Sequence, residues 1–234
     1  MVTATNEAPR RQAILDAALT CFLRSGVAGT TIDALCRESG ASVGSIYHFF
    51  GSKEGVAAEL YLDTLRDYID TYLAALHGSR SARAGIERSV RAHLGWVATH
   101  EAQAQYLFHC QELEVIKGSQ PAVARLRKQF YQQANAWLAP HVEHGRIKSL
   151  PPRLCQALWM GPSLEYARLW LVRSGDEFNI FDAQTALARA AWDSVKGQEA
   201  VWPSTKPAKA ANPKRRRSRS RHRAPGLTMH EYRP

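Results

Sequence analysis

The chain has 234 residues, 45% of them hydrophobic, and a formal net charge of +10 at pH 7. That composition supports a sizeable buried core and excludes a chain that is disordered throughout. The charge is uneven, because residues 203–234 hold ten lysines and arginines against the single acid Glu231, which leaves residues 1–202 at a net +1. The basic character therefore belongs to the C-terminal tail and does not by itself make the rest of the chain a nucleic-acid binder.

The cysteines and the hydropathy pattern indicate the compartment. The four cysteines, at positions 21, 36, 110 and 155, fit neither a metal knuckle nor a dense disulfide framework. The N-terminus lacks the apolar core of a signal peptide, and no apolar run approaches the roughly 20 residues that a membrane span needs. We therefore expect a soluble protein of a reducing cytoplasm with no membrane partner.

The first fifty residues carry three helical segments that glycines separate. Apolar residues at positions 14, 17, 18, 21 and 22 share one face of the first helix, which Gly26 is expected to end. Thr30 is expected to cap a second helix, with Asp33 in a weaker form of the capping box, and Gly40 ends that helix. Ser42 can cap a third helix that reaches about residue 50.

Helical periodicity continues to about residue 200 and predicts an all-α fold. Ser52 caps a long fourth helix whose leucine-rich stripe ends at Gly78. Gly161-Pro162 should kink a later helix. After Trp202 the composition shifts to Pro, Ala, Lys and Arg, which predicts a disordered basic tail over 201–234. The later helices are expected at about 81–99, 102–115, 120–144, 152–174 and 182–197.

The segment from Thr31 to Lys53 reads TIDALCRESGASVGSIYHFFGSK and has the physics of a helix-turn-helix. Two short helices meet at a tight turn through Gly40 and Ala41, where small residues let the helices pack. The second helix begins with small residues, so its N-terminal end can approach the bases in a DNA major groove.

This stretch resembles the TetR family of bacterial regulators, because a long signature matches in fixed register. The resemblance also covers the layout of residues 1–200, with a basic start to the first helix, a long fourth helix and a helical C-terminal domain. A purely structural helical hairpin would not require the Y-x-x-F-x-S-K ending. The matching residues are Thr31, Leu35, Cys36, Ser39, Gly40, Ala41, Ser42, Gly44, Ser45, Ile46, Tyr47, Phe49, Phe50, Ser52, Lys53 and Glu54.

The resemblance implies an all-α homodimer with a three-helix DNA-binding domain over 1–51 and an effector-binding and dimerisation domain over 52–200. The helices at 152–174 and 182–197 would pair two protomers, and an effector would move the fourth helix. The spacing of roughly 34 Å that successive major grooves require would then be lost. By the same resemblance Val43, Gly44 and Ser45 would face base edges, and the phosphates would be bound by Thr31, Ser42, Tyr47, His48 and Lys53.

The C-terminal half is rich in aromatic residues, which suits a pocket for a small apolar or aromatic effector. Aromatic residues at helical spacing are nevertheless more often plain core. The spacing of His141 and His144 is not diagnostic of a metal site, and no catalytic or nucleotide-binding fingerprint appears, so we expect no cofactor and no metal. The candidate effector residues are His93, Trp96, His100, Tyr106, His109, Phe130 and Trp137.

The sequence thus favours a DNA-binding transcriptional regulator, a homodimeric repressor that leaves a palindromic operator when an effector binds. It would act in the bacterial cytosol and associate with the nucleoid. One alternative is a similar DNA-binding protein without a small-molecule effector, and a weaker one is an enzyme of the helical domain. The basic run at 214–223 either adds salt-dependent attraction to phosphates or is a solvated extension.

Overall fold

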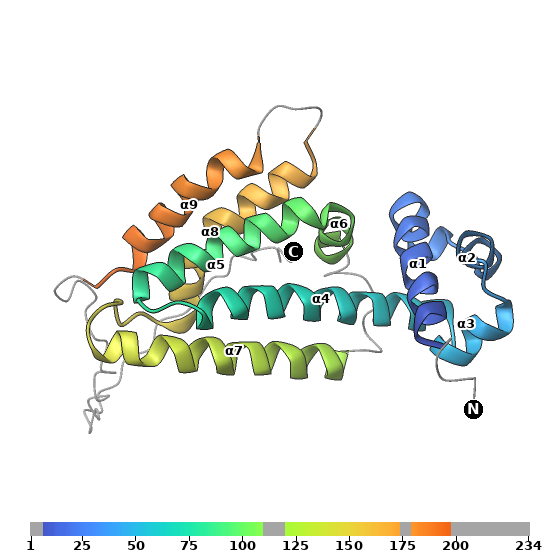
Figure 1. The fold of residues 1–234 in the computed structure, drawn as a ribbon, viewed down its shortest axis with the longest axis horizontal. Helices are drawn as coiled ribbons and strands as arrows, with labels where there is room; N and C mark the ends of the chain where they lie inside the picture. Colours follow the sequence, from blue (N-terminus) through green and yellow to red (C-terminus); the bar gives the residue numbers. More distant parts are fainter. Residues whose placement is uncertain (1–6, 110–119, 174–178, 198–234) are drawn as a thin grey trace, which may run out of the picture. The chain divides into compact units, whose positions relative to one another are not determined.

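A computed structural model describes residues 7–109, 120–173 and 179–197, and over these residues the chain forms nine helices and no strand (Figure 1). The predicted all-α fold is confirmed. Part of the helix expected at 102–115 and the tail over 201–234 lie outside the described residues. The helices are α1 Glu7–Gly29, α2 Ile32–Ser39, α3 Val43–Phe50, α4 Lys53–His77, α5 Ala82–Thr99, α6 Glu101–His109, α7 Gln120–Glu143, α8 Pro152–Leu171 and α9 Ile180–Val195.

Glycines interrupt or end the first helices as the sequence predicts. Gly26 has φ 68° and ψ 167°, so it breaks the helical path inside α1 before a last turn that reaches Gly29. Gly40 adopts the left-handed conformation that ends α2. The expected kink position in α8 lies inside one uninterrupted helix, which runs on through Gly161 and Pro162.

The predicted cap of α2 is wrong by one residue. Thr31 is the N-cap, and its hydroxyl accepts a hydrogen bond from the Ala34 N–H at 3.1 Å. Thr30 is buried instead, and its hydroxyl donates to the carbonyls of Cys21 and Gly26. Two adjacent threonines offer the same capping chemistry, so only the packing of α1 decides which of them caps α2.

Helix α4 is shared by the two parts of the described chain. Its first turns pack against α1 and α3, and the rest of the helix packs against α5, α6 and α7 (Figure 1). Its apolar stripe is buried along almost the whole helix, from Val56 to Leu76. Helix α4 therefore orients the N-terminal helices and also forms one side of the C-terminal core.

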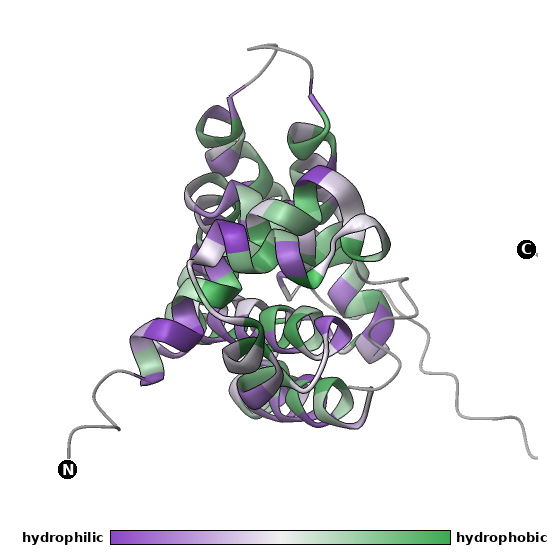
Figure 2. Cartoon of the chain, turned by 90° about the vertical axis from the view of Figure 1, so that its right-hand side faces the viewer, coloured by the Kyte–Doolittle hydropathy of each residue, from purple (hydrophilic) through white to green (hydrophobic). Residues whose placement is uncertain are grey.

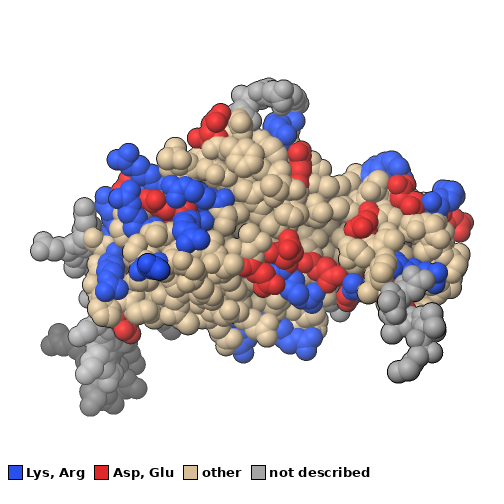
Figure 3. Space-filling model, in the orientation of Figure 1, with Lys and Arg blue, Asp and Glu red and all other residues tan. Residues whose placement is uncertain are grey.

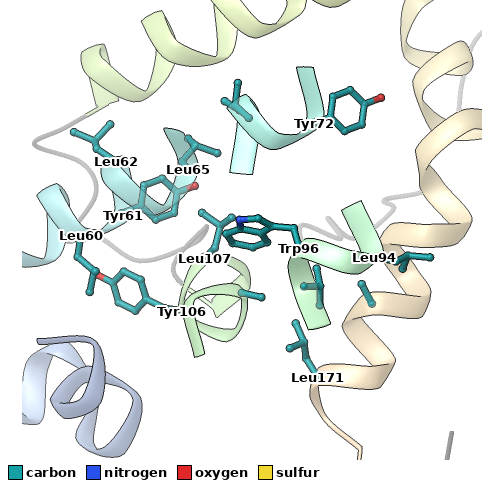
Figure 4. Close-up of a cluster of buried hydrophobic side chains, with 14 of the residues drawn as sticks. Leu60, Tyr61, Leu62, Leu65, Tyr72, Leu94, Trp96, Tyr106, Leu107 and Leu171 are labelled. Carbon is teal, nitrogen blue, oxygen red and sulfur yellow. The ribbon is translucent and has the colours of Figure 1, made fainter. Parts of the chain in front are cut away.

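The C-terminal core lies between α4 and the antiparallel pair α8 and α9, with α5 in the middle. Helix α5 packs against α4 on one side and against α8 and α9 on the other. Hydrophobic and hydrophilic residues alternate around the helices (Figure 2), and nearly all of the buried residues are apolar. In Figure 4, Trp96 of α5 and Leu107 of α6 lie together beneath the α4 residues Tyr61 and Leu65. Burial of this kind supplies most of the stability of an all-α domain.

A glycine in α5 allows a close aromatic contact. A Cβ on Gly85 would overlap the ring of Trp137 from α7, whereas a Cβ on Gly95 would meet only the flexible end of Gln184 at 3.8 Å. We expect Gly85→Ala to destabilise the protein by about 1–3 kcal/mol, because the indole must leave its position. Gly95→Ala is the matched control and should be neutral or stabilising by about 0.5–1 kcal/mol. Denaturant unfolding of the two variants measures the difference, and equal stabilities would contradict the predicted overlap.

Candidate nucleic-acid interface

The turn between α2 and α3 is held by local hydrogen bonds. The Gly40 N–H closes α2 by donating to the Cys36 carbonyl at 2.9 Å, and the Ala41 N–H donates to the Ser39 hydroxyl. The Ser42 hydroxyl then caps α3 by accepting from the Ser45 N–H at 3.2 Å. These bonds cap the two helix ends that meet at the turn.

One face of α3 anchors the helix, and the opposite face is exposed. Ile46 is fully buried and Phe50 nearly so, and both belong to the core of the N-terminal helices. Val43 and Tyr47 are 45% and 52% exposed. Gly44 and His48 are exposed beside them. The spacing of these four residues places them on one helical face that is free to enter a groove.

The serines and threonine predicted to contact DNA already have local roles. Ser42 and Thr31 are N-caps, and the Ser42 and Ser45 hydroxyls lie 3.0 Å apart within hydrogen-bond distance. Ser42 and Thr31 are exposed, and Ser45 is half-buried. A capped helix N-terminus of this kind also presents free N–H groups, which suits a phosphate oxygen.

Lys53 is engaged within the protein. Its Nζ donates to the Thr30 carbonyl at 2.7 Å and to the Ala28 carbonyl at 3.2 Å. The ammonium group thereby ties the first turn of α4 to the connection between α1 and α2. An ammonium has three protons to donate, which leaves one for the DNA phosphate contact that the sequence predicts. The structural role is one that the sequence did not suggest.

Two further contacts connect the N-terminal helices to α4 and α6, and sequence reasoning missed both. Arg11 of α1 pairs with Glu59 at 2.7 Å and with Asp63 at 3.1 Å, and its guanidinium lies 5.5 Å from the centre of the Phe50 ring. The two carboxylates are about fifty residues from Arg11 along the chain, so a local sequence pattern does not predict this pairing. The pairing fixes the position of α1 on α4.

The second contact runs through Tyr106 of α6. Its hydroxyl donates to the Ala57 carbonyl of α4 at 2.9 Å, and its ring stacks on Phe22 of α1 at 6.1 Å. Tyr106 is among the candidate effector residues, but the structure places it where α6 touches the N-terminal helices. Tyr106 therefore joins α6 to both α1 and α4.

The other candidate effector residues lie in the C-terminal core, against it, or at helix ends. His93 and Trp96 are buried in the C-terminal core, and Phe130 and Trp137 pack against that core from α7. His100 follows the last residue of α5, and its ring stacks on Trp96. His109 ends α6, and its side chain lies outside the described part of the structure.

His93 belongs to a buried polar cluster in that core. Its Nδ1 lies 3.0 Å from the Tyr68 hydroxyl, and its Nε2 lies 3.3 Å from the Ser163 carbonyl. Nearby, the Trp159 indole N–H donates to the Ser89 hydroxyl at 3.1 Å. Burial lowers the pKa of His93 to about 4, against which the Ser163 carbonyl acts weakly in the opposite direction. His93 is therefore neutral at physiological pH.

The described residues contain neither a candidate metal-binding cluster nor a candidate membrane-spanning helix. In the ranges that the structure describes, no cluster of three or more His, Cys, Asp or Glu side chains is placed to hold a metal ion. Within the same ranges, none of the helices combines the length and the apolar character that crossing a membrane requires.

Comparison with known proteins identifies similar chains. Residues 14–60 match the sequence profile described as bacterial regulatory proteins of the tetR family. The transcriptional regulator RutR of Escherichia coli K12 is 29% identical over 150 residues, which cover 62% of this chain and 67% of RutR.

Solved structures share the fold. A TetR family transcription regulator from Marinobacter aquaeolei VT8 superposes with a TM-score of 0.69 at 18% identity and covers 85% of this chain and 100% of its own. The regulator FadR of Bacillus subtilis, solved in complex with stearoyl-CoA, gives a TM-score of 0.66 at 16% identity and covers 78% of this chain and 98% of its own. At these identities the likeness shows the fold alone.

Lys53 and Tyr47 are expected to differ in what their substitution does. Both Lys53→Met and Tyr47→Ala should weaken DNA binding, because each removes a group that the sequence predicts to contact a phosphate. Only Lys53→Met should also lower the free energy of unfolding, by about 1 kcal/mol, because two carbonyls lose their donor. Tyr47→Ala should change that free energy by less than about 0.5 kcal/mol, since the side chain is exposed. Parallel unfolding and binding curves test this, and a large stability loss in Tyr47→Ala would make that residue part of the core.

The buried His93 should make the stability depend on pH. Because its pKa is lowered in the folded state, the stabilisation from its neutral form is complete above the unfolded pKa of about 6.5 and is lost as the pH falls towards 4. Between pH 7 and pH 4.5, His93→Gln should therefore lose about 2 kcal/mol less stability than the unmodified protein. Denaturant unfolding at both pH values measures this, and identical pH dependences would show that His93 is not a buried neutral group.

Proposed function

The chain belongs to the TetR family of bacterial DNA-binding transcriptional regulators, and from this premise we propose that it is a homodimeric repressor. It binds a palindromic operator through α3 and leaves that operator when a small-molecule effector binds. The observation that carries the proposal is the exposed face of α3, where Val43, Gly44, Tyr47 and His48 project from a helix anchored by buried Ile46. The protein would act in the bacterial cytosol, associated with the nucleoid.

The proposed division of labour along α3 follows from exposure and size. Val43, Gly44 and Ser45 at its start approach base edges, and Val43 offers an apolar contact to a thymine methyl group. Tyr47 and His48, one turn later, reach the phosphates with their polar ends, and Thr31, Ser42 and Lys53 complete that contact from the neighbouring helix starts. We divide the chain accordingly into a DNA-binding domain over 1–51, an effector and dimerisation domain over 52–200, and a tail over 201–234.

The proposed dimer forms through α8 and α9. Leu169 and Val172 at the end of α8, and Phe181 at the start of α9, are 45%, 59% and 53% exposed. An exposed apolar cluster of this size on two adjacent helices is typical of a surface that another chain covers. Two copies joined there can place two recognition helices on successive major grooves.

The proposed effector response runs through α4 and α6. A ligand that separates α5 from α4 or α7 would displace α6, whose Tyr106 contacts both α1 and α4. The spacing of the two recognition helices would change without any change in their reading surface. A protein of this fold, FadR of Bacillus subtilis, is known in complex with stearoyl-CoA.

A second candidate is a regulator of the same family that responds to a partner protein instead of a small molecule. It is favoured by the completeness of the core, because in the described residues each buried side-chain nitrogen or oxygen has a hydrogen-bond partner. His93 in particular already uses both ring nitrogens within the protein. An effector would have to displace one of these bonds in order to be recognised there.

Selection of binding sites from random duplex DNA tests the proposal. The full chain is expected to enrich a palindrome whose half-sites lie about one helical turn apart. Leu169→Glu should yield a monomer by sedimentation and lose most of the affinity for that palindrome, whereas Leu23→Glu, an exposed apolar position in α1, should remain dimeric. Failure to enrich any sequence would contradict sequence-specific reading by α3, and a dimeric Leu169→Glu would remove α8 from the proposed interface.

A further inference from the structure

The end of the molecule where α4 finishes carries a concentration of positive charge, which we call the basic pole. It comprises residues 78–91, 141–153 and 189–197. The first segment holds four arginines and Glu87, the second two arginines, a lysine and Glu143, and the third an arginine, a lysine and Asp193. Figure 3 shows these cations gathered over the start of α5 and the end of α9. The three segments thus hold nine cations against three acids.

Backbone and side-chain contacts hold the three segments together. The Lys148 N–H donates to the Val195 carbonyl at 2.9 Å, and the Gly197 N–H donates to the Arg146 carbonyl at 2.8 Å. Helix α5 also packs along α9. The pole is therefore a fixed surface built from parts that are far apart in the sequence.

The acids of the pole do not neutralise it. Glu87 is shared by Arg83 at 2.7 Å and Arg91 at 3.4 Å. Asp193 is shared in the same way by Lys196 at 2.7 Å and Arg189 at 3.9 Å. Each carboxylate holds two cations in place and offsets the charge of one, so an ordered excess of positive charge remains at the surface.

The N-terminal helices α1 to α3, which we call the reading end, lack such an excess of positive charge. Residues 7–53, which include α1 to α3, hold five lysines and arginines against four acids. The two ends are separated by α4, whose 25 residues span about 38 Å at 1.5 Å per residue. Phosphates next to the recognition helix therefore lie beyond the reach of the basic pole of the same protomer.

We propose that the basic pole is a second nucleic-acid surface, which binds the phosphates of a duplex DNA segment other than the one that α3 reads. The binding is independent of base sequence, because the pole offers cations and no groove-entering helix. Duplex DNA is the ligand because its dense and regular phosphates match an extended cationic surface, and because the α3 end already brings the protein to DNA. Residues 203–234, with ten further cations against Glu231, continue the chain beyond α9.

Fluorescence anisotropy with a 24-base-pair duplex of random sequence, titrated by the full-length protein at several salt concentrations, tests this surface. The variant is R80Q/R153Q, two exposed arginines of the pole. The matched control is R125Q/K128Q, which removes the same charge from exposed positions of α7. A full-length R215Q/R216Q/R217Q variant measures the contribution of the tail. Circular dichroism melting establishes that each variant is folded.

R80Q/R153Q is expected to weaken binding several-fold near 0.1 M salt and to lower the slope of log K against log salt by about 1 to 2. The control should leave that slope within error of the unmodified protein. Equal slopes in the pole variant and the control would overturn the proposal. So would loss of all sequence-independent binding in the tail variant together with no change in the pole variant.

A two-colour experiment separates the pole from the reading end. Two random duplexes with different dyes, mixed with the full-length protein, should appear together in single complexes, and R80Q/R153Q should lose this coincidence while the control R125Q/K128Q retains it. Coincidence that survives unchanged in R80Q/R153Q would overturn the proposal and assign the bridging to another surface. Tighter binding of duplex RNA than of duplex DNA at the same length would overturn the choice of DNA.

Discussion

The packing of α4 against both parts of the chain is the constraint on which the arrangement depends. Its first turns complete the core around α3, and its remaining turns form the floor of the C-terminal core. The ion pairs of Arg11 with Glu59 and Asp63 join α1 to the same helix. Because both the N-terminal and the C-terminal helices pack on α4, neither group can move without a change in its contacts with α4. The position of α3 therefore depends on the rest of the molecule, although the turn before α3 is formed by local hydrogen bonds.

Much of the fold was predictable because it rests on local rules. Apolar spacing located the helices, and Gly26, Gly40 and Gly78 marked interruptions or ends that the structure confirms. The choice of Thr31 over Thr30 as the cap was not predictable, since both residues have the required hydroxyl. That choice depends on the burial of Thr30 beneath the kink at Gly26, which is a tertiary effect.

The candidate site was predictable only as far as the residues of α3 itself. The partners of Lys53 are carbonyls more than twenty residues earlier in the chain. The hydroxyl of Tyr106 in α6 donates to the Ala57 carbonyl in α4, which is also distant in sequence. Local sequence patterns predict neither contact. The aromatic residues of the C-terminal half, Trp96 and Trp137 among them, suggested an effector pocket, but their spacing does not distinguish a pocket from a packed core. Likewise, the net +1 of residues 1–202 conceals a basic pole, because its cations come from three separate segments and are offset by acids elsewhere.

Ser42 caps α3 and is also predicted to contact DNA, and this affects which residues can change when the base preference of the protein changes. Ser42 caps α3 and lies against Ser45, so most replacements at Ser42 would fray the helix before they altered its recognition. Val43 is exposed, and a Cβ added at Gly44 would meet only the Ser42 hydroxyl at an ordinary 3.9 Å, so both positions are replaceable without loss of the scaffold. Natural variation, or a design that retargets the protein to another DNA site, can therefore change Val43 and Gly44 while Ser42 is kept.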